Sequence, residues 1–256
     1  MNMKLLKRCT AAFLAVSVLS IGLTANAAQS SDPISADSSS TPVLQAYSNS
    51  ELGFPAPTNG QVPYDQYLSA LLDVCFRNDS QAFVALGLGT AEEAASIYNA
   101  VLNSELLSIE LDSLFTTECP EVLINDLQNL MARMLGSVRY AVTGCELQAD
   151  GTYQVTIVYE QMILFQPLME LYMAVVTDMA TNWSSNYNSY PSDEELPVYI
   201  IAALCDSLRV CLDNVTYAEP AITTVSFEPQ DGTYLPNMDD LYNLQNLLFD
   251  TSYILN

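Results

Sequence analysis

The sequence predicts an α+β fold, in which a curved antiparallel sheet of two hairpins packs against about six helices. Two observations support this prediction. Apolar residues recur at helical spacing in six separate segments. Two further segments alternate apolar and polar residues beside an Asp-Gly pair, which is typical of β-hairpins. The same four residues, Asp-Gly-Thr-Tyr, stand at 150–153 and 231–234, and we interpret them as shared turn chemistry rather than duplication.

Three helices are expected first. An apolar stripe over residues 64–75 predicts the first helix. Thr90 and Glu93 have the spacing of a capping box, ahead of the second stripe. Pro120 suits the first turn of a third helix, whose stripe ends at Met134.

After the third helix, apolar residues recur at every second position, as they do in a β-strand. Val138, Tyr140 and Val142 alternate with polar or small residues, and the pattern resumes after the turn at residues 150–151, which predicts the first hairpin. A fourth helix is expected from Pro167.

A fifth helix, a second hairpin and a short final helix are expected after the fourth helix. Ser192 and Glu195 form a second capping box before the fifth helix, whose start we expect two or three residues later because of Pro197. Strand character over Thr216–Glu228 predicts the second hairpin, and Asn237 is expected to cap a short final helix.

The first 27 residues have the three parts of a secretory signal peptide. Lys4, Lys7 and Arg8 form a basic start, and an uncharged apolar run follows from Ala11. The run is too short to span a bilayer, which takes about 20 residues. Small residues then lead up to Ala27, where we expect cleavage.

Three regions are therefore predicted: a signal peptide over residues 1–27, a flexible Ser/Pro/Thr-rich linker over 28–62, and a single α+β domain over 63–256. A lipid anchor would need a cysteine directly after the apolar run, and Cys9 lies before it. We expect a secreted, extracellular protein that is not lipid-anchored and does not associate with a membrane after signal removal.

Composition excludes several functions. The whole chain has 30 acidic and seven basic residues and no histidine. Removal of the signal leaves four arginines and no lysine, so the formal charge changes from −23 to −26. Nucleic-acid binding depends on basic residues that neutralise phosphates, and none is expected here. Nucleophilic sites that use histidine or lysine are also excluded.

The sequence contains no pattern that is typical of a metal site or of a reactive thiol pair. Three carboxylate clusters, at 92–93, 193–195 and 239–240, stand where negative charge stabilises a helix start, and none has the spacing of a calcium loop. We predict no cofactor, and leave open a weakly held Ca²⁺ or Mg²⁺ on the acidic surface. The five cysteines beyond the signal contain no CxxC pair, and we interpret most of them as small core residues.

One segment is a candidate ligand site. Trp183, Tyr187 and Tyr190 lie in a stretch rich in Asn and Ser, interpreted as a loop between helices with no core for the rings to enter. Aromatic rings exposed in this way can stack on sugars. The alternative is an ordinary interhelical loop. Most other tyrosines follow helix or strand periods and are expected in the core.

Local sequence also resembles a known family. The segments that carry the resemblance are Phe76–Asp79, Thr90–Ala94, Arg139–Gly144 and Asp150–Ile157. Together with the element order over about 62–250, they resemble exported proteins of Gram-positive, mostly gut-dwelling bacteria that are described only as domains of unknown function. The resemblance implies a cystatin/NTF2-like fold. It implies no functional residues.

These inferences lead to one expected function and two alternatives. We expect a secreted, non-catalytic protein that binds an unidentified ligand of the cell envelope or the extracellular medium. A carboxylate-pair enzyme acting on glycans is the first alternative, because such an enzyme needs no histidine. A structural or interaction protein of the envelope is the second.

Overall fold

The structure of the chain is a computed structural model. It describes residues 63–108, 119–185, 191–192, 195–230 and 233–250. The predicted signal peptide, the predicted linker and the candidate residues Tyr187 and Tyr190 lie outside these ranges.

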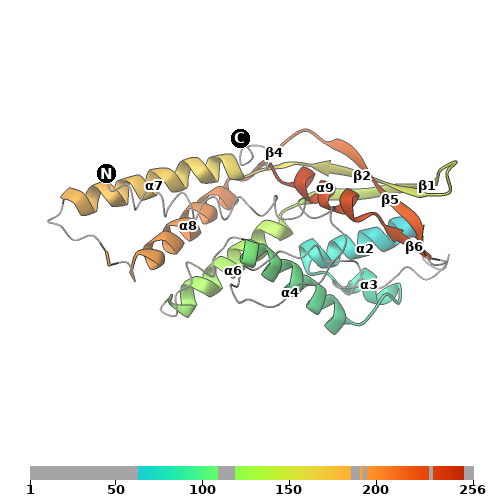
Figure 1. Cartoon of the computed structure of the whole chain (residues 1–256), viewed down its shortest axis with the longest axis horizontal. Coiled ribbons are helices and arrows are strands. Elements are labelled where there is room, and N and C mark those ends of the chain that lie inside the picture. The colour runs from blue at the N-terminus through green and yellow to red at the C-terminus, as the bar shows by residue number, and fades with distance from the viewer. Residues whose placement is uncertain (1–62, 109–118, 186–190, 193–194, 231–232, 251–256) are drawn as a thin grey trace, which may run out of the picture.

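The described residues form seven helices and six strands, which confirms an α+β fold (Figure 1). The helices are α2 (Tyr64–Arg77), α3 (Gln81–Ala85), α4 (Ala91–Ser108), α6 (Glu121–Gly136), α7 (Phe165–Ser185), α8 (Leu196–Asp213) and α9 (Met238–Leu248). The strands are β1 (Arg139–Leu147), β2 (Tyr153–Glu160), β3 (Met162–Ile163), β4 (Thr216–Tyr217), β5 (Ala221–Gln230) and β6 (Thr233–Pro236).

Both predicted hairpins are present, and they join into one antiparallel sheet of strand order β1-β2-β5-β6. The β1–β2 turn is closed by the amide of Gly151, which donates to the Gln148 carbonyl over 3.1 Å. Gly151 has φ 88°, a conformation that favours glycine. Central pairing of β2 with β5 places Tyr153 opposite Phe227.

The strand region predicted over Thr216–Glu228 is divided in the structure. Thr216 and Tyr217 form β4, which pairs with β3 in a separate two-stranded sheet. The amide of Ala218 then donates to the Gln161 carbonyl over 2.9 Å, and β5 begins only at Ala221. Pro220 stands at the break, and its missing N–H suits the end of a ladder rather than its middle.

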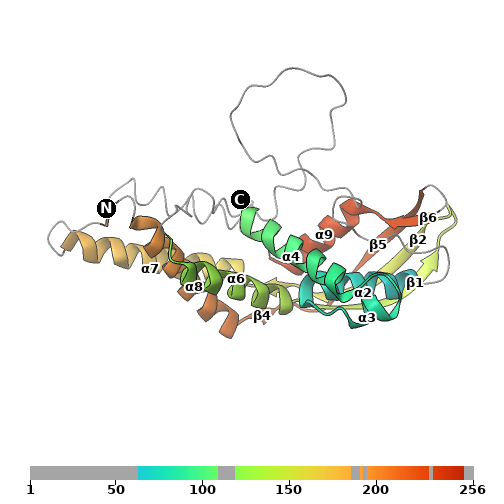
Figure 2. The ribbon, with the colours of Figure 1, turned by 90° about the horizontal axis from the view of Figure 1, so that it is seen from below.

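The helices cover one face of the sheet. Val155 and Ile157 of β2 are fully buried, whereas their neighbours Gln154 and Thr156 are only half-buried. α2 packs against β1 and β2 on the buried face, and α9 packs against β5 (Figure 2). In both views α7 and α8 lie at the end of the molecule away from this sheet.

The predicted helix caps are confirmed. Thr90 and Glu93 exchange hydrogen bonds at the start of α4, with the Thr90 amide 2.7 Å from a Glu93 carboxylate oxygen. Ser192 and Glu195 make the same exchange before α8. That helix begins at Leu196, so Pro197 falls in its first turn and breaks no hydrogen bond.

Candidate functional site

A polar hollow opens where the β5–β6 hairpin meets the start of α9. Its volume is about 460 Å³, and its lining residues are Glu228, Pro229, Leu235, Pro236, Asn237, Met238 and Asp239. We call this space the polar hollow. None of these lining residues is basic, and the two carboxylates belong to exposed residues.

Hydrogen bonds hold the floor of the polar hollow in place. The Asn237 side chain accepts from the amides of Asp239 and Asp240, and its Nδ2 donates to Glu228 over 2.8 Å. The Asn237 amide donates to the Ser226 carbonyl over 2.7 Å. In return, the Ser226 amide donates to Asp240 over 2.8 Å. These hydrogen bonds thus fix the start of α9 to strand β5.

The sequence predicts only part of this site. Asn237 is correctly predicted as a cap, and the carboxylates at 239–240 are correctly placed in the first turn of α9. The polar hollow itself is not predicted, because it depends on the tertiary positions of the β5–β6 hairpin and the start of α9. Glu228 carries no sequence signal that separates it from the other carboxylates.

A second, apolar hollow lies between α2, α4 and α9. Its volume is about 110 Å³. Leu72 and Phe76 of α2 line one side, Val101 of α4 another, and Leu241 and Met238 of α9 a third. We call this space the apolar hollow.

Trp183 is the one residue of the predicted aromatic ligand site that lies within the described residues, and its setting differs from the one expected. Trp183 lies in the last turn of α7, not in a loop. Its ring packs edge-on against Tyr199 of α8, with the centroids 5.3 Å apart. Trp183 is half-buried against the core, so the interpretation that its ring has no core to enter is wrong. The tyrosines predicted to lie in the core do pack there: Tyr64, Tyr67, Tyr98, Tyr140, Tyr153 and Tyr172.

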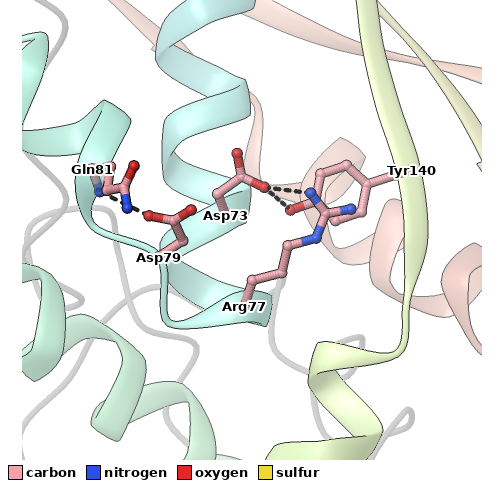
Figure 3. Close-up of polar contacts among 5 residues, drawn as sticks. All are labelled: Asp73, Arg77, Asp79, Gln81 and Tyr140. Carbon is pink, nitrogen blue, oxygen red and sulfur yellow. Dashed lines mark hydrogen bonds and ion pairs between the residues drawn. The ribbon is translucent and has the colours of Figure 1, made fainter.

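A polar cluster joins α2 to β1 (Figure 3). The Tyr140 hydroxyl and Arg77 both donate to the same Asp73 carboxylate oxygen, each over 2.8 Å. The Arg77 guanidinium also lies over the Tyr140 ring, 4.3 Å from its centroid. Burial, and then the Asp73 charge, raise the pKa of Tyr140 well above its ordinary value. The phenol is therefore a fixed hydrogen-bond donor, and the cluster stabilises the fold rather than supplying a base.

Every arginine of the described residues is engaged within the chain. Arg77 pairs with Asp73, Arg133 with Asp213, Arg139 with Glu160, and Arg209 with both Asp126 and Asp206. Arg139 also lies 3.7 Å from the centroid of the Tyr217 ring. The excess of carboxylates over arginines therefore leaves the surface of the described part of the chain strongly negative.

The cysteine thiols are poorly suited to act as nucleophiles. All five cysteines of the described residues are free, and Cys75, Cys205 and Cys211 are buried, as predicted for core residues. Burial raises the pKa of Cys75 and of Cys205 to about 12. Thiols that stay protonated in this way are weak nucleophiles.

Among the residues that the structure describes, no group of three or more Cys, Asp or Glu side chains is arranged to hold a metal ion. The same part of the chain contains no helix that is both long and apolar enough to cross a bilayer.

The chain matches no model of a known protein family, no curated protein and no solved structure. The candidate site therefore rests on its own geometry.

Proposed function

We propose that the protein is an exported, non-catalytic binding protein of the cell envelope or the extracellular medium, and that the polar hollow is its ligand site. The observation that carries this proposal is the hollow itself. Its volume of about 460 Å³ falls within the range of small-molecule sites, roughly 300–1,000 Å³. Its floor is held by five hydrogen bonds around Asn237 and Ser226, so little order has to be gained on binding.

The chemistry of the lining indicates the class of ligand. The carboxylates of Glu228 and Asp239 are hydrogen-bond acceptors, and no described lining residue is basic. A ligand group rich in hydrogen-bond donors fits this lining, either the hydroxyls of a sugar or an ammonium group. An anionic group would be repelled, both here and by the acidic surface around it.

The alternative of a carboxylate-pair enzyme has one observation in its favour, since Glu228 and Asp239 line the same hollow. Glycosidases hold one carboxyl protonated by enclosing it in apolar surroundings. Both residues are exposed here, which favours binding over hydrolysis. Failure to cleave aryl glycosides at any pH between 4 and 8 would agree with this preference.

The alternative of an envelope interaction protein requires a contiguous exposed apolar patch. Among the residues that the structure describes, the large apolar residues that are well exposed are spread over several elements: Val84, Val122, Leu147, Tyr199, Val210 and Ile222. Exposed apolar residues spread in this way are ordinary on a protein surface.

The finer description of the fold as cystatin/NTF2-like is likewise a proposal, supported by an antiparallel sheet that packs against helices on one face.

Calorimetric titration tests the proposed site. The probes are neutral oligosaccharides, tetramethylammonium chloride and CaCl₂, each at low and high salt. We expect one of the first two to bind and the double variant Glu228→Gln/Asp239→Asn to bind at least tenfold more weakly. If the affinity falls at high salt, the ligand group is an ammonium ion. If the affinity does not depend on salt, the ligand group is a sugar.

The matched control is Glu92→Gln/Glu121→Gln, which removes two exposed first-turn carboxylates from elsewhere on the surface. It should bind as the wild type does. Equal losses in both variants would mean that overall charge, and not the polar hollow, determines binding.

A further inference from the structure

The polar and apolar hollows are neighbours. Met238, the first residue of α9, lines both of them. On one side of it lie Glu228 and Asp239, and on the other lie Leu241 and Val101. Met238, which is half-buried, therefore borders both a space that contains two carboxylates and a space lined mainly by apolar residues.

The apolar hollow is a partly open gap between α9, α2 and α4. Leu244 and Leu248 of this helix are buried, whereas Leu241 is only half-buried. The gap lies beside Leu241, where α9 faces α2 and α4. Its lining is mostly hydrocarbon, with Tyr242 and Gln245 as the polar members, and water gains few hydrogen bonds in such a space. An apolar group of matching size would stabilise this region by filling it.

We infer that the ligand is amphiphilic: a donor-rich head occupies the polar hollow, and a short alkyl group passes Met238 into the apolar hollow. This inference rests on the proposed function, and adds to it the class of molecule. Each half of the ligand has its own set of lining residues. The shared chemistry is a donor-rich head with a short alkyl chain, supplied either by an alkyl glycoside or by an alkylammonium ion.

Met238 is well suited to stand at this junction. Its unbranched thioether side chain has three rotatable bonds, and it can move aside without a change in the backbone. It also belongs to the first turn of α9, which Asn237 and Ser226 fix to the sheet. The backbone of the junction is therefore held while its side chain adapts.

The volume of the apolar hollow sets an upper limit on the chain. An apolar cavity of about 150 Å³ holds benzene. A hollow of about 110 Å³ is smaller than that, and accordingly takes about four methylenes rather than an aromatic ring. Affinity should rise about fourfold with each added methylene up to that length, and then level off.

The experiment uses two series of probes, methyl to octyl glucosides and methyl- to octylammonium chlorides, each kept below its micelle concentration. Titration calorimetry gives the affinity of each member. We expect the methyl compound to bind weakly in the active series, and the affinity to rise to about butyl. The Val101→Phe variant fills the apolar hollow and should remove the dependence on chain length while leaving the affinity of the methyl compound within twofold.

Val84→Phe is the control, because it makes the same change at an exposed position on α3. Circular dichroism and a melting curve verify folding, and Leu241→Phe replaces Val101→Phe should the latter not fold. Affinity that is independent of chain length in the wild type overturns the amphiphile and leaves the proposed function in place. Chain-length dependence that survives in the folded filling variant also overturns it. Failure of every probe to bind overturns both proposals.

Discussion

The Tyr140 hydroxyl donates to the Asp73 carboxylate over 2.8 Å and joins residues that are 67 positions apart in the chain. Asp73 belongs to α2 and Tyr140 to β1, one of the two edge strands of the four-stranded sheet. Arg77 completes the cluster by pairing with the same oxygen and covering the Tyr140 ring. The contact thus helps to fix the first helix on the sheet that carries the polar hollow.

Tyr140→Phe should lower the free energy of unfolding by about 1–2 kcal/mol, because it removes a part-buried hydrogen bond to a charged acceptor. The ring remains, so its packing against Phe76 and its contact with Arg77 are retained. Urea denaturation measures the change. The control is Tyr199→Phe, at a residue that is 43% exposed, where we expect less than about 0.5 kcal/mol. Equal effects at the two positions would contradict a special role for the contact with Asp73.

Cys75 and Cys205 should resist thiol reagents in the folded protein. Burial raises the pKa of each to about 12, so at pH 8 only about one thiol in ten thousand is a thiolate. Labelling with iodoacetamide, followed by mass spectrometry, should leave both unmodified over minutes. In 6 M guanidinium chloride both should react. Rapid labelling of Cys75 in the native protein would contradict the burial on which the prediction rests.

The capping carboxylate Glu195 should titrate below its ordinary value of 4.5. Hydrogen bonds from the Ser192 amide, and then from its hydroxyl, lower the pKa of Glu195. A lowered folded-state pKa means that the cap stabilises the fold above the unfolded value. This contribution is lost as the pH falls below about 4.5 and through the folded pKa. Carboxyl NMR titration measures the shift. Ser192→Ala should move the pKa part of the way back, and no movement would contradict the assigned partners.

Sequence predicts the local elements of this fold well, for a physical reason. Capping boxes such as Thr90 with Glu93 depend on residues three apart, and the hairpin turn at Gly151 depends on one backbone conformation. Both are complete within a few residues. The sequence therefore predicts where these helices and turns begin without knowledge of the tertiary fold.

Features that depend on distant partners are not predicted. Trp183 stands among polar residues, which favours a loop, yet α7 continues through it because Tyr199 of α8 supplies a packing partner. Thr216 and Tyr217 have strand character like β5, yet they pair with β3 instead. The polar hollow depends on Glu228 and Asp239, eleven positions apart, being brought together by β6 and α9.

An NMR chemical-shift map tests the central claim most directly, that the polar hollow is a ligand site. Spectra of the protein are recorded as butyl glucoside and butylammonium chloride are added in turn. We expect saturable shifts for the amides of Glu228, Asn237 and Asp239 with one of the two probes, and additional shifts at Val101 and Leu241. Saturable shifts confined to another part of the molecule, or no shifts with either probe, would contradict the proposed site.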